Sequence, residues 1–174
     1  MKDEARATLI RRLTPEDHAA FVALNNSAAP DMSLLTSERL DALIGFGGVG
    51  CVVDETGQLL AGALWFDETT RGYDSPNYRW FRDRFDRFTY VDRIIVAPGM
   101  RGRGFGHRIY QSVFAAAAAA QSPVVTCEIY EVPPNPASRA FHEQLGFTII
   151  GRQSLESGIR EAAMMARPVV PGSR

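Results

Sequence analysis

The chain has 174 residues and a formal net charge of −1 at pH 7. This length suits one domain, and the near-zero charge argues against a nucleic acid as an electrostatic partner. No apolar run approaches the roughly 18 residues of a membrane span, and residues 1–4 lack the apolar character of a signal peptide, so we expect a cytoplasmic protein with no membrane partner. Cys51 and Cys127 have no metal-binding or redox spacing, and we expect no metal.

The part of the chain before residue 67 predicts strands and helices in turn. Expected are a strand at 7–13, helices that begin at 14–15 and at 36–37, and a hairpin with strands at 51–54 and 58–66. Thr14 can cap the first helix, and Pro15 is tolerated in a first turn because an N–H there has no intrahelical partner. Residues 67–88 are polar and aromatic, and we expect them to be irregular. A loop of this length in a compact domain is usually functional or partly structured.

The rest of the chain predicts a second series of elements. Expected are strands at 89–96, 123–130, 147–151 and 160–166, helices at 104–121 and 138–145, and a frayed tail at 169–174. The alternation of these elements predicts one α/β domain with a mixed central sheet. We place this domain at residues 1–168.

A glycine-rich turn between the strand at 89–96 and the alanine-rich helix is the most informative segment. Its residues are Arg101, Gly102, Arg103, Gly104, Phe105 and Gly106. The first N–H groups of a helix have no intrahelical partner, and the helix dipole adds positive charge there, so a helix start of this kind binds phosphate. Glycines let the backbone approach a ligand closely, and the arginines add charge that suits a pyrophosphate.

Two other phosphate-binding loops do not fit this turn. A P-loop requires a Gly-Lys pair, which the chain does not contain. A dinucleotide-binding loop requires Gly-x-Gly-x-x-Gly or Ala, and here the last position is His107 or Ile109, depending on the register. The spacing therefore argues against a nucleotide-dependent oxidoreductase.

The register that fits is Arg-x-x-Gly-x-Gly, formed by Arg101, Gly104 and Gly106. It resembles the acetyl-coenzyme A loop of the GCN5-related N-acetyltransferase (GNAT) superfamily. A second block, residues 135–147, is similar to a later helix of that superfamily and to the Leu-Gly-Phe that starts its next strand. The resemblance implies a single α/β (α+β) domain with a mixed, mostly antiparallel central sheet flanked by helices. It also implies direct transfer of an acetyl group from acetyl-coenzyme A to an amine in a ternary complex.

The resemblance implies how the cofactor is held. The strand before the loop would bind the pantetheine arm through its backbone, the loop would bind the pyrophosphate, and two residues of the second block would add contacts. The residues concerned are Ile94, Ile95, Val96, the six loop residues at 101–106, Asn135 and Phe141. Two alternatives stay open: Asn135 as a turn residue and Phe141 as a core aromatic residue.

Catalytic candidates follow from the same comparison. Many family members have a tyrosine as proton donor where this chain has His142, which either replaces that acid or packs in the helix. Tyr90 and Asp92 lie just upstream of the cofactor-binding residues 94–96, where the superfamily often places a base or a water-ordering group. Asp92 and Glu128 could form a carboxylate pair near the amine, in which one pKa rises, or Asp92 could pair with Arg93.

The acceptor is expected to be a small-molecule or peptide amine bound beside residues 67–88. Aromatic walls with a few charges are typical of such pockets, and Tyr73, Tyr78 and Trp80 are the candidates. The oligomeric state, a homodimer included, stays open. One alternative function is a coenzyme A-binding sensor or regulatory domain without catalysis, which the His142 replacement leaves open.

Overall fold

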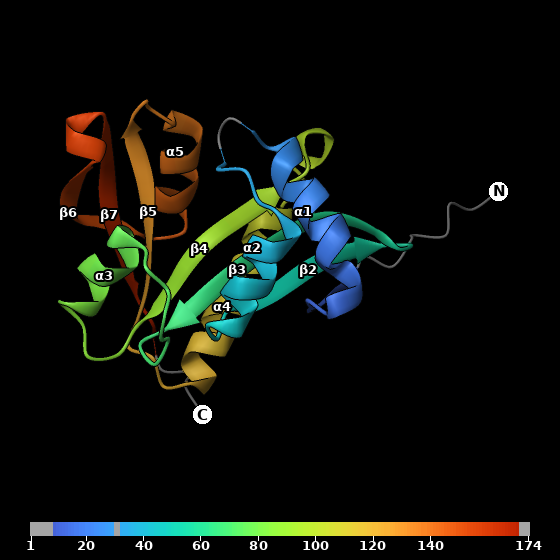
Figure 1. Cartoon of the computed structure of the whole chain (residues 1–174), viewed down its shortest axis with the longest axis horizontal. Coiled ribbons are helices and arrows are strands. Elements are labelled where there is room, and N and C mark those ends of the chain that lie inside the picture. The colour runs from blue at the N-terminus through green and yellow to red at the C-terminus, as the bar shows by residue number, and fades with distance from the viewer. Residues whose placement is uncertain (1–8, 30–31, 171–174) are drawn as a thin grey trace. The chain divides into compact units, whose positions relative to one another are not determined.

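The computed structural model describes residues 9–29 and 32–170. These residues form seven strands with the hydrogen-bonded order β1-β2-β3-β4-β5-β7-β6 (Figure 1). The described residues divide into two compact units, one formed by residues 9–29, 32–65 and 93–113 and the other by residues 66–92 and 114–170. No helix among the described residues is long and apolar enough to cross a membrane.

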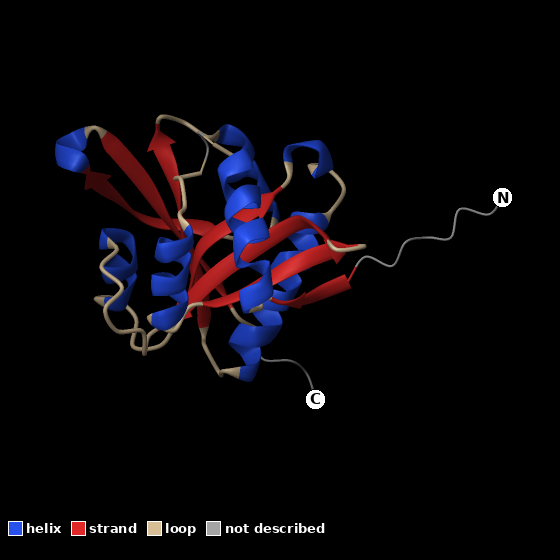
Figure 2. Cartoon of the chain, turned by 45° about the vertical axis from the view of Figure 1, so that its right-hand side comes forward, coloured by secondary structure: helices blue, strands red, loops and turns tan. Residues whose placement is uncertain are grey.

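The first unit contains the antiparallel strands at the start of the chain. Its elements are β1 (Leu9–Arg12), α1 (His18–Ser27), α2 (Ser37–Gly45), β2 (Val49–Glu55) and most of β3 (Gln58–Asp67). Both expected helix starts are confirmed, although Pro15 opens a 3-10 turn that precedes α1. Thr36 caps α2, because its side chain accepts a hydrogen bond from the Arg39 N–H at 3.1 Å. α1 and α2 contact each other, and β3 supplies a run of buried residues to the core. Figure 2 distinguishes the helices from the strands of the chain by colour.

The second unit contains the strands at the end of the chain. Its elements are α3 (Pro76–Arg82), β5 (Val124–Val132), α5 (Pro136–Gln144), β6 (Thr148–Leu155) and β7 (Arg160–Pro168). β7 pairs antiparallel with β5 on one side and with β6 on the other, so β6 is an edge strand. β4 (Thr89–Val96) and α4 (Phe105–Ala119) run from one unit into the other.

The expected mixed, mostly antiparallel sheet is confirmed. Among the described residues, β5 pairs in parallel with β4, and the pairs β1–β2, β2–β3, β5–β7 and β6–β7 are antiparallel. The expected strand at 7–13 is observed from Leu9, and residues 7 and 8 lie outside the described residues. Residues 171–174 of the expected tail also lie outside them, and the domain boundaries at 1–168 stay a prediction.

The segment 67–88 was expected to be irregular, and this was wrong for its centre, which forms α3. Ser75 caps the helix by accepting a hydrogen bond from the Tyr78 N–H at 3.3 Å, and Pro76 occupies the first turn. The Ser-Pro pair is the same type of signal as Thr14-Pro15. The helix is only seven residues long, too short for its apolar spacing to stand out. Tyr78 and Phe81 anchor it in the core.

Candidate active site

The glycine-rich loop has the backbone of an open anion cradle. Gly102 and Gly104 have φ angles of 77° and 80°, in the left-handed region that favours glycine. A Cβ built at either position would meet nothing within 4 Å, and residues 101–104 are exposed. α4 begins at Phe105, and the Gly104 carbonyl accepts the Arg108 N–H at 3.0 Å. The structure therefore places a bare turn immediately before the start of a long helix.

Several backbone N–H groups of this loop have no acceptor within the described part of the protein. Among the described residues, those of Gly102 and of residues 104–106 make no backbone hydrogen bond outside regular secondary structure, and of these residues Gly102 and Gly104 are exposed. Unpaired N–H groups at a helix start are the usual donors to phosphate oxygens. Arg101 and Arg103 are exposed within the same turn. The loop thus suits a pyrophosphate both in its donors and in its charge.

The strand that leads into the loop leaves its parallel neighbour early. β4 and β5 pair only through Thr89–Val125 and Tyr90–Thr126 among the described residues. Further along β4, Ile95 is buried, whereas Ile94 and Val96 are half-buried. β4 also has β3 as its neighbour on the other side, so only the backbone groups that face β5 lose their strand partner there. Backbone groups on such a side can hydrogen-bond an extended ligand.

Glu128 on β5 lies at the centre of a buried polar cluster in the second unit. Its Oε1 accepts hydrogen bonds from the Tyr90 hydroxyl at 3.1 Å and from Asn77 Nδ2 at 3.0 Å. Its Oε2 is buried and has no hydrogen-bond partner among the described residues. The two oxygens of one carboxylate therefore differ: one is held by the protein, and the other is left to accept a proton or a ligand.

The surroundings of Glu128 raise its pKa to about 7. Burial is the main cause, and the negative charge of Asp92 adds to it, while the hydrogen bonds from Tyr90 and Asn77 act in the opposite direction. A carboxylate with a pKa near neutrality is suited to general base catalysis, because it can hold a proton and release it at neutral pH. The predicted Asp92–Glu128 pair therefore has the electrostatic coupling expected of it.

Asp92 accepts a hydrogen bond from the Tyr73 hydroxyl. Burial and the charge of Asp92 raise the pKa of Tyr73, so this phenol stays protonated and acts as a donor. The pKa of Tyr90 is also raised, first by burial and then by Glu128. Arg93, the alternative partner of Asp92, donates to Asn25 Oδ1 at 2.9 Å within the first unit.

His142 is buried in the helix α5. It is 4% exposed, and its Nδ1 lies 2.7 Å from the Ser138 carbonyl oxygen one turn earlier. Its ring makes edge contacts with Phe141 and Phe147. Burial lowers the pKa of His142, which favours the neutral ring. The structure therefore favours the packing role over the role of proton donor.

The three aromatic residues expected to line the acceptor pocket have different surroundings. Tyr73 stacks on Phe66 with ring centroids 4.3 Å apart and reaches Asp92, so it belongs to the polar cluster. Tyr78 is fully buried, and its hydroxyl donates to the Asp67 carbonyl at 2.7 Å, so it is a core residue in this structure. Trp80 is half-buried, with the Arg84 guanidinium 3.7 Å from its ring centroid.

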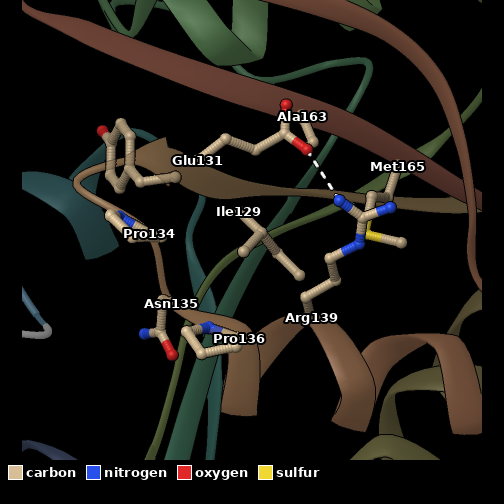
Figure 3. A pocket seen from close by; sticks show the side chains of 9 residues that line it. Ile129, Glu131, Pro134, Asn135, Pro136, Arg139, Ala163 and Met165 are labelled. Atoms are coloured by element: carbon tan, nitrogen blue, oxygen red, sulfur yellow. Dashed lines mark hydrogen bonds and ion pairs between the residues drawn. The ribbon is translucent and has the colours of Figure 1, made fainter.

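The second sequence block borders a pocket of about 290 Å³ between α5, β5 and β7 (Figure 3). Asn135 lines this pocket and also caps α5, accepting a hydrogen bond from the Ser138 N–H at 3.1 Å. Glu131 binds Arg139 at 2.9 Å at the same pocket. Phe141 is half-buried on α5. The turn role considered for Asn135 is thus observed, and its contact with a cofactor stays a prediction.

Two residues of the polar cluster were missed from the sequence. Asn77 is 4% exposed and donates to Glu128, and Gln153 Nε2 donates to Asn77 Oδ1 at 3.2 Å. Asn77 lies in α3, within the segment 67–88 that was expected to have no regular structure. Gln153 lies on an edge strand far along the chain, and no local pattern links it to Glu128.

Solved structures of acetyltransferases share this fold. The ribosomal-protein-S18-alanine N-acetyltransferase from Escherichia coli is 16% identical, with a TM-score of 0.72, and 97% of each chain is covered. The ribosomal-protein-alanine N-acetyltransferase from Brucella melitensis is 22% identical, with a TM-score of 0.67 and coverage of 92% of this chain and 99% of that chain. A GNAT superfamily phosphinothricin acetyltransferase from Sinorhizobium meliloti, in complex with AcCoA, is 18% identical, with a TM-score of 0.67 and coverage of 95% and 90%.

The sequence itself gives a family assignment. None of the curated proteins matches the chain. The sequence profile of the Acetyltransferase (GNAT) family, in contrast, matches residues 10–147, which is well over half of the chain. This match includes the glycine-rich loop, Glu128 and the second block. The resemblance expected from these motifs is confirmed, and the chain belongs to the GNAT family of acetyltransferases.

Proposed function

We propose that the chain is an N-acetyltransferase that moves an acetyl group from acetyl-coenzyme A directly to a small-molecule or peptide amine. The observation that carries the proposal is Glu128, a carboxylate with one oxygen held by two donors, one buried oxygen without a partner, and a pKa raised to about 7. An amine must lose a proton when it is acylated, and this group is built to accept one. Two of the similar structures are named as N-acetyltransferases.

Acetyl-coenzyme A would be held by the loop and by β4. The N–H groups of residues 102–106, with Arg101 and Arg103, suit its pyrophosphate, and the backbone of residues 94–96 suits its extended pantetheine arm. The similar phosphinothricin acetyltransferase was solved with AcCoA. When bound, this co-substrate supplies an acetyl thioester. Asn135 and Phe141 would contribute from the second block.

Glu128 and Asp92 would prepare the amine. The negative charge of the pair attracts an acceptor that arrives as an ammonium ion, and Glu128 Oε2 takes the proton, directly or through a water molecule. The neutral nitrogen then attacks the thioester carbonyl, the C–N bond forms and the C–S bond breaks. The second proton lost by the nitrogen passes through solvent to the departing thiolate, so the coenzyme leaves as the thiol. Asp92 accepts a hydrogen bond from Tyr73 beside the cluster. We assign no proton transfer to His142, because it is buried and its Nδ1 already meets the Ser138 carbonyl.

The test is release of coenzyme A thiol in the presence of a panel of amines, with the acetylated product identified by mass. We expect turnover to rise with pH through about 7 as Glu128 ionises, and Glu128→Gln to lose this acidic limb with a decrease of about 10²–10⁴-fold. Glu143→Gln on the exposed side of α5 is the matched control and should keep the limb. Binding of acetyl-coenzyme A without turnover of any amine would instead support the sensor domain.

A further inference from the structure

We propose that α3 is a positioning element for the base, and that Asn77 and Gln153 orient Glu128 through a chain of two amide hydrogen bonds. This inference rests on the proposed function, since it assumes that Glu128 is the base. It adds two positioning residues, one from α3 and one from the edge strand β6: Asn77 contacts the base itself, and Gln153 contacts Asn77.

The chain of hydrogen bonds has a defined direction. Gln153 Nε2 donates to Asn77 Oδ1 at 3.2 Å, and Asn77 Nδ2 donates to Glu128 Oε1 at 3.0 Å. A side-chain amide has a donor end and an acceptor end, so its orientation must be fixed by its partners. Gln153 occupies the acceptor end of Asn77 and thereby turns the donor end to the carboxylate. If Asn77 turned over, its carbonyl would face the carboxylate and repel it.

This arrangement selects which oxygen of Glu128 reacts. The Tyr90 hydroxyl and Asn77 Nδ2 both donate to Oε1. Oε2 is buried and receives no hydrogen bond from any described residue. A lone pair on Oε2 is therefore left for the proton of the amine, while the carboxylate is held in one orientation from the other side. Preorganisation of this kind removes the cost of reorienting the base during the reaction.

The contact between α3 and β6 sets this geometry. Asn77 and Trp80 are three residues apart on α3 and so lie on one helix face, and Gly151 and Gln153 are two apart on β6 and so share one strand face. Asn77 meets Gln153, and Trp80 meets Gly151 so closely that a Cβ at Gly151 would lie 2.5 Å from Trp80 Cζ2. The two contacts hold the helix in register on the strand.

Other groups near Glu128 are accounted for. Asp92 raises the pKa of Glu128, and Tyr90 lowers it through its hydrogen bond. The pKa values of Tyr73 and Tyr130 are raised in part by Glu128, so both phenols stay neutral. A hydrogen bond with Asn77 and the charge of Arg160 act on the pKa of Tyr130 in the opposite direction. Gln153 carries no charge and does not touch Glu128, so its effect on the base must pass through Asn77.

The test is the pKa of Glu128 in Asn77→Leu, in Gln153→Leu and in the double variant. It is measured in two ways: by NMR titration of the carboxyl carbon in the unliganded protein, and from the acidic limb of the pH–rate profile. Loss of a hydrogen bond to a charged group should raise the pKa by about one to two units in Asn77→Leu. Gln153→Leu should raise it less. In the Asn77→Leu background, Gln153→Leu should cause no further change in the pKa of Glu128. Ser154→Ala, at the next and exposed position of β6, is the control.

The isosteric variant Asn77→Asp serves if Asn77→Leu does not fold, and its added carboxylate should shift the pKa in the same direction. An additive effect of Gln153→Leu in the Asn77→Leu background would overturn the relay, because Gln153 would then act by another route. The relay would also be overturned if the acidic limb of the pH–rate profile were unshifted in both single variants, provided that Glu128→Gln loses this limb. If Glu128→Gln keeps the limb, the proposed base is wrong, and the NMR titration still decides whether Asn77 and Gln153 act on Glu128.

Discussion

Trp80 and Gly151 are in contact so close that only a glycine fits at position 151. A Cβ there would lie 2.5 Å from Cζ2 and 2.8 Å from Cη2 of the indole. We expect Gly151→Ala to reduce the free energy of unfolding by about 1–3 kcal/mol, as overpacking does. The smaller ring in Trp80→Phe should recover part of the loss in the double variant. Gly45→Ala at the end of α2, where a Cβ would meet nothing within 4 Å, is the control and should not destabilise. Urea denaturation measures all four proteins, and equal stability of Gly151→Ala and the wild type would contradict the contact.

Glu128 should make the protein less stable as the pH rises. Its folded pKa of about 7 lies above the usual value of 4.5, so between these values the folded state binds the proton more tightly than the unfolded state. The free energy of unfolding therefore falls from about pH 4.5 to pH 7, by roughly 3 kcal/mol at most. Glu128→Gln removes this dependence. We expect the variant to gain stability relative to the wild type between pH 5 and pH 8, measured by urea denaturation, whereas a parallel pH dependence would show an ordinary pKa.

The anion cradle can be tested with two substitutions of equal size. Gly104 has a φ of 80° and open space around its Cα, and Asn and Asp tolerate the left-handed region better than other residues. Gly104→Asp adds a negative charge beside the unpaired loop N–H groups, whereas Gly104→Asn adds the same bulk without charge. We expect coenzyme A affinity, measured by calorimetry, to fall about tenfold or more further in the Asp variant. Equal coenzyme A affinities in the two folded variants would contradict the assignment of this loop as the pyrophosphate site.

His142 should matter for stability and not for proton transfer. It is buried, contacts two phenylalanine rings and places Nδ1 2.7 Å from the Ser138 carbonyl. We expect His142→Ala to cost about 1–3 kcal/mol of unfolding free energy, because it leaves a cavity and removes the contact between Nδ1 and the Ser138 carbonyl. Turnover of the folded variant should change by less than about tenfold. A loss of 10²-fold or more with normal coenzyme A affinity would restore the histidine as the acid.

The local features of the site were predictable from the sequence, and the features formed by distant segments were not. The strand at 89–96 and the glycine loop were readable because a β-branched run, three glycines and a helix start are contiguous. The coupling of Asp92 and Glu128 was readable from strand alternation. Asn77 and Gln153, 76 residues apart, meet only because α3 packs on β6. No spacing rule links a short helix to an edge strand, so sequence patterns could not find this pair.

Burial decided the other differences. Tyr73, Tyr78 and Trp80 look alike as aromatic residues in a polar segment, but the fold puts Tyr78 in the core and Tyr73 on Asp92. The sequence around His142 likewise does not distinguish a histidine that faces a substrate from one that packs against two phenylalanine rings. Composition and spacing report residue types, whereas exposure depends on the packing of the whole unit.

The last prediction separates the site role of Tyr73 from the structural role of Tyr78. Each loses one hydroxyl on substitution by phenylalanine, and each hydroxyl now has a known acceptor: the carboxylate of Asp92 for Tyr73 and the carbonyl of Asp67 for Tyr78. Tyr73→Phe removes one hydrogen bond that orients Asp92, so we expect the KM for the amine to rise about 3–10-fold with coenzyme A affinity unchanged. Tyr78→Phe should leave the KM unchanged and cost about 1 kcal/mol of unfolding free energy, because the Asp67 carbonyl keeps only the hydrogen bond from the Thr70 N–H. Steady-state kinetics and denaturation of the same preparations give both quantities. If the two variants raise the KM equally, or if only Tyr78→Phe does, then Asp92 does not face the acceptor.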